Sequence, residues 1–506
     1  MMTRERKNIL CGVFIVTVVY VATLWQRPLF APWEYDFAAL SMAGTDSFSA
    51  LLNGVFGKAL SFNTVSVRLM PALCSILCAL CVRFCGKTAE NENFGNLAAI
   101  MYLANFLVFS FGTACSKEMI CTLFFTAAAT SALAALKNDT LSKARFFLLG
   151  AASGCACGFF ALSAGYISAA AVPLAAIAGF SAAKKKSLFP VISLVFAAAV
   201  CGAWMLKHPL PVMAKTKAFQ FSELLWVIPA LLPWGLFVFQ AAAAVRSKKK
   251  EYFSTPLVQL ALFVTVCALL SAAFLGTALA LLIALPMLTT AFAAALKLSA
   301  GDRKLLKISE LTLNYVSVAI ILFTAATVVL CCLKSVPARW KLYYSKAELA
   351  GFAVAVTVAL IQFRIAASSN VDSGAKKLLH VATGAAVLMI LLPGAVPQRM
   401  KNTFAPDEFF RSISARYIPA DAEIYADADS IGAVRWILRD RKITLITRKS
   451  VHPLAKRIEN DLPTAVFSTS GRFTKVLPRT KMLFSRGIWR IVICQTKGTS
   501  VYEKNL

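Results

Sequence analysis

Long apolar runs recur along most of the chain and limit what it can fold into. A helix needs about 17–25 apolar residues to cross the ~30 Å hydrocarbon layer of a membrane. With 58% hydrophobic residues, the chain is too apolar for a soluble globular domain. The sequence therefore predicts a polytopic α-helical membrane protein whose membrane domain covers residues 1–397. Thirteen spans are expected, at residues 9–25, 66–84, 94–114, 119–136, 146–163, 166–182, 188–206, 222–245, 253–275, 277–297, 311–333, 346–366 and 378–396.

The basic residues predict the orientation of these spans. A net charge of +29 would suggest nucleic acid as the partner of a soluble chain, but here lysines and arginines lie mostly in short loops between apolar runs. With a cytoplasmic N-terminus, every alternate short loop is basic, as the positive-inside rule requires. No cleavage site follows the first run, so it is expected to remain as a span. These features predict a multi-pass protein of the cytoplasmic (inner) membrane.

Residues 398–506 contain no run that could span a membrane and are rich in charged residues. Short strands are predicted at 423–426, 443–447, 465–468 and 488–495, with helices at 430–438 and 452–459 between them. Such alternation indicates a small α/β domain. Because the number of predicted spans is odd, this domain is expected on the extracytoplasmic, periplasmic side.

Three acidic residues are expected at the outer face of the membrane domain. Glu34 and Asp36 follow the first span in a segment, Arg27 to Asp36, where prolines predict an ordered loop. Glu118 lies at the outer end of the third span. Carboxylates held at a membrane face can act as bases or orient a substrate. The alternatives are an ordinary interfacial loop and a solvated Glu118 that pairs with Lys117.

Two outer loops are basic although orientation does not require it. Lys207 and His208, together with Lys215 and Lys217, are in one; Arg339 and Lys341, with Lys334, are in the other. Anionic phosphate is a natural partner of such residues. Contact with lipid headgroups at the outer interface remains an equally good interpretation.

Four of the fourteen cysteines have a spacing that resembles a metal motif. Cys74, Cys78, Cys81 and Cys85 are separated by four, three and four residues, which places them on one face of a helix. Packing between helices through small residues explains this better than metal ligation.

Four short motifs follow one another along the chain. They are Pro-Trp-Glu-Tyr-Asp-Phe-Ala at residues 32–38, Val-Arg-Leu-Met-Pro-Ala-Leu at residues 67–73, the acidic stretch Lys117–Cys121, and a leucine-rich run ending in Pro-Trp at Ile228–Trp234. Their order resembles the GT-C superfamily of integral-membrane glycosyltransferases, in the branch of the lipid A aminoarabinose transferase and the protein O-mannosyltransferases. The first motif is similar to that branch's Pro-Asp-Glu-x-x-Tyr-Ala motif in the first outer loop, the second and fourth are similar to patterns in its spans, and the third matches loosely.

The resemblance implies transfer of a sugar from a polyprenyl-phosphate donor to a lipid, glycan or protein acceptor at the outer face. Glu34 would be the base, with Asp36 as second choice and Glu118 orienting the acceptor. The donor phosphate would be held by basic residues, for which the candidates are Arg68, Lys58, Lys207, His208, Arg339 and Lys341. Arg68 could instead form a structural ion pair with Glu118 or Asp36. No cofactor is predicted, but a divalent metal is possible; two or three scattered carboxylates do not make a coordination shell.

The chain departs from the family pattern in ways that keep other functions open. Trp33 occupies the place of the family's usual catalytic aspartate, and a Glu-Lys-Pro-Pro-like stretch is absent from the first outer loop. An inactive GT-C-like partner subunit would fit these differences. A transporter of lipid-linked sugars is a further alternative, although it should show repeated halves, which the sequence lacks.

Overall fold

The structure is a computed structural model. It describes residues 32–43, 47–137, 141–186, 188–209, 221–298, 346–367, 374–391, 406–460, 462–469, 482–486, 489–494 and 502–505, together with some residues within 18–24 and 307–322. Within these residues, six helices are long and apolar enough to cross a membrane. They are α4 (Ser66–Ala89), α7 (Glu118–Lys137), α8 (Lys143–Ala164), α10 (Leu188–Met205), α14 (Pro256–Leu275) and α15 (Thr277–Leu298).

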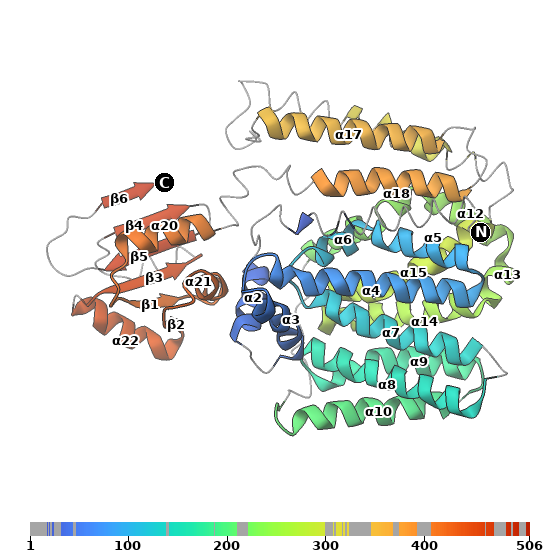
Figure 1. Cartoon of the computed structure of the whole chain (residues 1–506), viewed down its shortest axis with the longest axis horizontal. Coiled ribbons are helices and arrows are strands. Elements are labelled where there is room, and N and C mark those ends of the chain that lie inside the picture. The colour runs from blue at the N-terminus through green and yellow to red at the C-terminus, as the bar shows by residue number, and fades with distance from the viewer. Residues whose placement is uncertain are drawn as a thin grey trace.

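These helices run side by side in one bundle (Figure 1). The bundle also contains α9 (Ala171–Ala183), which follows a short 3₁₀ turn, and α17 (Lys346–Ala367) beside α18 (Gly374–Leu391). The predicted polytopic helical class is confirmed. The total of thirteen spans is not established, because the predicted spans 9–25 and 311–333 lie largely outside the described residues.

Two predicted spans are interrupted rather than continuous. The run at 94–114 forms α5 (Glu92–Leu103) and α6 (Phe106–Gly112), which are bent by 67°. Asn105 makes this break, because its side chain caps α6 by accepting from the amides of Leu107 and Val108, at 3.0 and 3.4 Å. The run at 222–245 is divided into η2 (Phe221–Trp226), α11 (Val227–Leu231), η3 (Trp234–Phe237) and α12 (Val238–Ser247), and is followed by α13 (Lys249–Ser254).

Small residues bring the helices of the bundle close together. A Cβ atom on Gly154 of α8 would lie 2.3 Å from the carbonyl oxygen of Ser193 on α10, so only glycine fits there. On α4, Cys74, Cys78 and Cys85 are buried, and the Cys85 thiol lies 3.2 Å from the Thr130 hydroxyl of α7. The cysteine face of α4 therefore packs between helices, as its spacing predicts.

Two short helices, α2 (Pro32–Ala43) and α3 (Phe48–Ala59), lie across one end of the bundle (Figure 1). The prediction of an ordered loop through Asp36 is therefore wrong from Pro32 onward. Proline is tolerated at the first position of a helix, since the amide hydrogen that it lacks has no intrahelical acceptor there.

The C-terminal residues form a small α/β unit with one sheet. Its strands are β1 (Glu423–Ala426), β2 (Ile443–Leu445), β3 (Thr464–Ser468), β4 (Met482–Arg486), β5 (Trp489–Cys494) and β6 (Tyr502–Asn505), in the order β2-β1-β3-β5-β4-β6. β1 pairs in parallel with β2 and β3, whereas β5 is antiparallel to β3 and β4. The helices are α20 (Asp407–Tyr417), α21 (Ile431–Ile437) and α22 (Arg448–Glu459).

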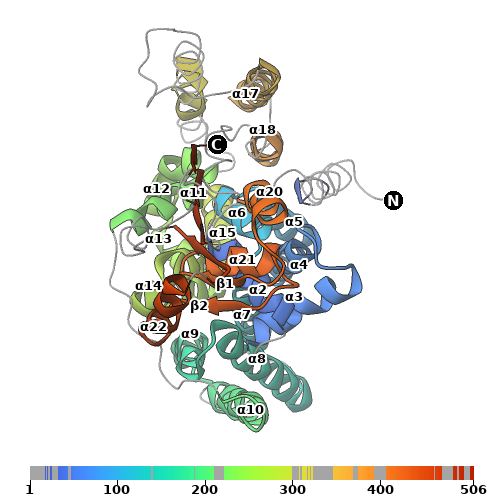
Figure 2. The ribbon, with the colours of Figure 1, turned by 90° about the vertical axis from the view of Figure 1, so that its left-hand side faces the viewer.

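This α/β unit lies at the end of the bundle that carries α2 and α3. α21 packs against α2, and Figure 2 looks along the bundle from that side. Arg439 donates a hydrogen bond of 3.3 Å to the carbonyl of Phe62, and the Tyr35 hydroxyl of α2 donates to Asp407 at the start of α20. The α/β unit and the acidic first segment therefore share one end of the molecule.

Candidate active site

Glu34 and Arg68 form a buried ion pair at the junction of α2 and α4. The Glu34 side chain is 1% exposed and that of Arg68 is fully buried. Arg68 reaches Glu34 through Nε at 3.2 Å and through Nη2 at 3.1 and 3.3 Å. Of the two ion pairs considered for Arg68, with Glu118 or with Asp36, neither is seen; its partner is Glu34. The carboxylate thus fixes the guanidinium, and α2 to α4, in one geometry.

The turn between α6 and α7 completes this arrangement. The backbone amide of Cys115 donates to Oε1 of Glu34 at 2.9 Å, so three chain segments meet at one carboxylate. Three residues further on, Glu118 begins α7 and is partly exposed. Within the part of the chain that the structure describes, its carboxylate has no hydrogen-bond or ion-pair partner. Lys117 turns instead to the carbonyl of Ala164, at 3.3 Å, and does not pair with Glu118.

Asp36 lies on α2 two residues after Glu34 and faces the α/β unit. Its side chain is half-buried, and a Cβ atom on Gly432 of α21 would come within 2.0 Å of its Oδ1. Burial raises the pKa of Asp36 to about 6, and the negative charge of Asp429 acts in the same direction, against the hydrogen bond from the Gly432 amide. A carboxyl with a pKa near 6 can accept a proton close to neutral pH.

The structure adds a polar pair that the sequence did not reveal. The Tyr35 hydroxyl donates to Asp407, and Arg411 and Arg68 lie near enough to favour the charged form of that carboxyl. Burial is the larger effect and raises the pKa of Asp407 above its usual value. No sequence signal links Tyr35 to Asp407, because they are 372 positions apart.

The predicted phosphate contacts are only partly near this site. Lys58 is exposed in the last turn of α3. Lys207 and His208 follow α10, where the imidazole ring stacks on Trp204 with ring centroids 4.4 Å apart. Trp204 in turn meets Phe48 of α3 at 5.4 Å. These basic residues therefore border the α3 side of the same bundle end. Arg339 and Lys341 lie outside the described residues.

The described carboxylates do not make a metal centre. No group of three or more His, Cys, Asp or Glu side chains in that part of the chain is placed to hold an ion. Arg68 and the Cys115 amide already bind the Glu34 carboxylate.

Comparison with solved structures assigns the fold. ArnT from Cupriavidus metallidurans in the apo state superposes with a TM-score of 0.75 at 15% identity, covering 96% of this chain and 97% of ArnT. ArnT bound to undecaprenyl phosphate gives 0.73 at 14% identity, over 97% and 98%. The oligosaccharyltransferase from Archaeoglobus fulgidus gives 0.50 at 11% identity, over 92% of this chain and 70% of that one. No protein-family model and no curated protein matches the sequence. The chain therefore shares the fold of ArnT over nearly its whole length.

Proposed function

We propose that this protein is a membrane glycosyltransferase that moves a sugar from a polyprenyl-phosphate donor to an acceptor. The observation that carries the proposal is that Glu34 and Asp36 both lie on α2, and that the Glu34 carboxylate also binds the turn leading into Glu118 of α7, in a chain with the ArnT fold. These three residues are named the acidic cluster. ArnT itself binds undecaprenyl phosphate. A polyprenyl-phosphate donor fits a site at the end of an apolar bundle, since its lipid chain can remain in the membrane.

The charge distribution supports an extracytoplasmic site in the cytoplasmic (inner) membrane. The bundle end opposite α2 carries Lys137 at the end of α7, Lys143 at the start of α8, Lys184 after α9 and Lys297 near the end of α15. The positive-inside rule assigns that basic end to the cytoplasm. The α/β unit and the acidic cluster then face the outside, and we take the boundary between membrane domain and α/β domain as residue 398.

The proposed roles follow from how freely each carboxylate can act. Glu34 is held by Arg68 and by the Cys115 amide, so its oxygens are already engaged and it is suited to positioning. Asp36, whose pKa is raised to about 6, is the better base. Glu118 is partly exposed and has no bonding partner among the described residues, so it can orient an acceptor hydroxyl.

In the reaction, an acceptor hydroxyl oxygen attacks the anomeric carbon of the donor sugar. The bond from that carbon to the phosphate oxygen breaks, and the polyprenyl phosphate leaves with the bonding electron pair. Asp36 takes the hydroxyl proton. Lys58, Lys207 and His208, with Arg339 and Lys341, are the basic residues proposed to stabilise the departing phosphate.

A second candidate, an inactive GT-C-like partner subunit, is favoured by two observations. The carboxylate nearest to the family's catalytic position, Glu34, is fully engaged in an ion pair, and the usual aspartate is replaced by Trp33. Such a protein would keep the fold and the lipid site without turnover.

Transfer by reconstituted variants tests the proposal. Purified protein in proteoliposomes receives a panel of undecaprenyl-phosphate pentoses and hexoses, and released undecaprenyl phosphate is measured by mass spectrometry. Asp36→Asn and Glu118→Gln are each expected to lower the rate by about 10²-fold, the scale of one general base or orienting group. Asp440→Asn, which changes an exposed carboxylate of the α/β unit, should leave it unchanged. Normal rates in both site variants would refute these roles, and an inactive wild type would favour the partner subunit.

A further inference from the structure

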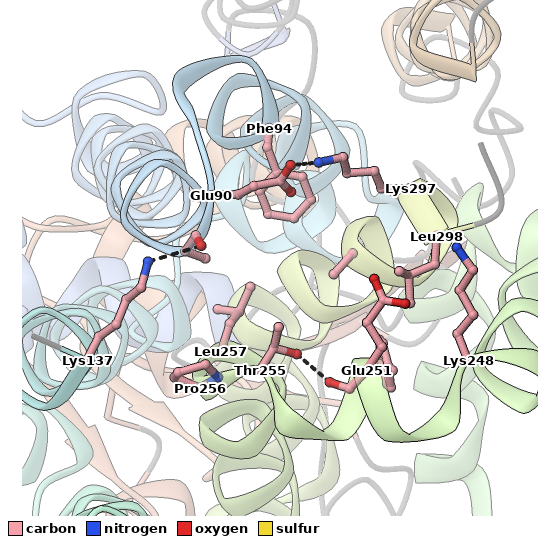
Figure 3. Close-up of a pocket in the computed structure, with 13 residues that line it drawn as sticks. Glu90, Phe94, Lys137, Lys248, Glu251, Thr255, Pro256, Leu257, Lys297 and Leu298 are labelled. Atoms are coloured by element: carbon pink, nitrogen blue, oxygen red, sulfur yellow. Dashed lines mark hydrogen bonds and ion pairs between the residues drawn. The ribbon is translucent and has the colours of Figure 1, made fainter. Parts of the chain in front are cut away.

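A cavity with charged lining residues lies at the bundle end opposite the acidic cluster. Its volume is about 460 Å³, and it lies where α4, α7 and α15 end and where α13 and α14 meet (Figure 3). The proposed transfer reaction does not use it. Its charged lining residues are Lys137, Lys248, Lys297, Glu90 and Glu251.

Two of the lysines are bound within the wall. Lys137 donates to the carbonyl oxygens of Thr88 and Ala89, the latter at 3.1 Å, and so caps the C-terminal end of α4. Lys297 forms an ion pair with Glu90, and Figure 3 shows this pair across one side of the cavity. Lys137, Lys297 and Glu90 therefore already have partners within the protein.

The remaining two charges are opposite in sign and stand close together in sequence. Lys248 precedes α13 and Glu251 lies in its first turn. Both side chains are exposed, and within the described part of the chain neither has a hydrogen bond or an ion pair. In Figure 3 both rise from the same side of the cavity. The cavity therefore offers one available ammonium and one available carboxylate.

An apolar groove adjoins this cavity. It has a volume of about 410 Å³ and is lined by side chains of α12, α13 and α15, among them Val238, Val245, Phe253 and Phe292. Two basic residues, Arg246 and Lys249, also border it. Tyr252 borders both spaces and is held by a hydrogen bond of 3.1 Å from its hydroxyl to the carbonyl of Ala291. A ligand with a charged head and an apolar tail can place one part on each side of Tyr252.

We propose that this end of the bundle binds a glycerophospholipid with a zwitterionic phosphoethanolamine headgroup. Lys248 receives the phosphate, Glu251 receives the ammonium, and one acyl chain follows the groove past Phe253 and Phe292. A mixed-sign lining suits a zwitterion better than a headgroup that carries only negative charge. The adjoining apolar groove favours a lipid over a soluble phosphate ester.

Titration of the delipidated full-length protein tests this by native mass spectrometry. The probes are dioleoyl-phosphatidylethanolamine, dioleoyl-phosphatidylglycerol and soluble O-phosphoethanolamine. Wild-type protein should prefer phosphatidylethanolamine to phosphatidylglycerol by about threefold to fivefold, the scale of one exposed ion pair. Glu251→Gln should abolish the preference, and Lys248→Ala should weaken both lipids. Lys250→Ala is the matched control, because Lys250 is exposed only two residues further along the chain and does not line the cavity.

Three results would overturn the proposal. If the wild type bound phosphatidylethanolamine and phosphatidylglycerol with equal affinity, the proposed recognition of a phosphoethanolamine headgroup would be wrong. Binding of O-phosphoethanolamine as tight as that of the lipid would show that the groove contributes nothing. An effect of Lys250→Ala equal to that of Lys248→Ala would reduce the site to general surface charge.

Discussion

The buried pair of Glu34 and Arg68 shows how one residue contact can organise a whole site. An arginine in an apolar span must find an anionic partner, and here it finds one on α2, the helix that also carries Asp36. The same carboxylate accepts from the Cys115 amide just before α7. Loss of either charge would leave the other buried without compensation.

Arg68→Met should therefore destabilise the protein strongly, by about 3–5 kcal/mol, because it strands the Glu34 carboxylate. The double variant Glu34→Gln with Arg68→Met should recover most of this loss, since neither charge of the pair is then left without its partner. Thermal unfolding in detergent measures both. A double variant as unstable as the single one would mean that the ion pair is not the source of the effect.

The pKa of Asp36 leads to a prediction for the pH dependence of transfer. A base works only when ionised, and burial raises the pKa of this carboxyl from 3.8 to about 6. The value of kcat/KM should therefore be low at pH 5, rise through about pH 6 and level off above it. A profile that is flat from pH 5 to 8 in the wild type would argue against Asp36 as the base.

At the scale of helices and strands, much of the fold could be predicted, because hydrophobic length and alternation are local signals. The predicted spans at 66–84, 119–136 and 277–297 correspond to α4, α7 and α15, and strands at 423–426 and 465–468 are found at β1 and β3. The breaks were missed. Local hydrophobicity cannot show that Asn105 caps α6. Nor can it show that the side-chain amide of Asn105 donates to the carbonyl of Ala230, 125 residues away, at 2.7 Å.

The candidate site was predicted less completely, for a related reason. Motif order drew attention to Glu34, Asp36 and Arg68. Their pairing depends on tertiary contacts, so sequence could not tell that Arg68 meets Glu34 or that Gly432 covers Asp36. Helix α20, which brings Asp407 to Tyr35, was also not predicted.

The contact between α8 and α10 gives a test of helix packing. Gly154→Ala would place a methyl group 2.3 Å from the Ser193 carbonyl and should cost roughly 1–3 kcal/mol through overpacking. Gly202→Ala on α10 is the control, because no atom lies within 4 Å of its Cβ position. The unfolding temperature should fall for Gly154→Ala only. Equal unfolding temperatures for the two variants would contradict the close approach of these helices.

At the scale of the whole molecule, the α/β unit is packed against the helix that carries the proposed site residues and is not a separate appendage. α21 packs on α2, and the Gly432 backbone lies against Asp36. Any separation of the unit from the bundle would expose the proposed base to water and lower its pKa. A variant that loosens the packing of the α/β unit on α2 is therefore expected to lower the rate of transfer as well.

Gly432→Ala tests this coupling. Its Cβ would meet Asp36 Oδ1 at 2.0 Å and the Asp36 backbone at 2.7 Å, so α21 must move away from α2. Hydrogen exchange of amides in α2 and α21 should become faster. Arg435→Ala, at an exposed position of the same helix, should not change it. Unchanged exchange in Gly432→Ala would mean that the two units do not depend on this contact.

The location of the donor phosphate tests the account most directly. A structure of the protein determined by electron cryomicroscopy with undecaprenyl phosphate is predicted to show the phosphate at the bundle end formed by α2, α3 and the start of α7. There it would lie beside Asp36 and Glu118 and within reach of the basic residues that border α3 and α10. A phosphate bound at the opposite, lysine-rich end, or no binding at all, would contradict the proposed site.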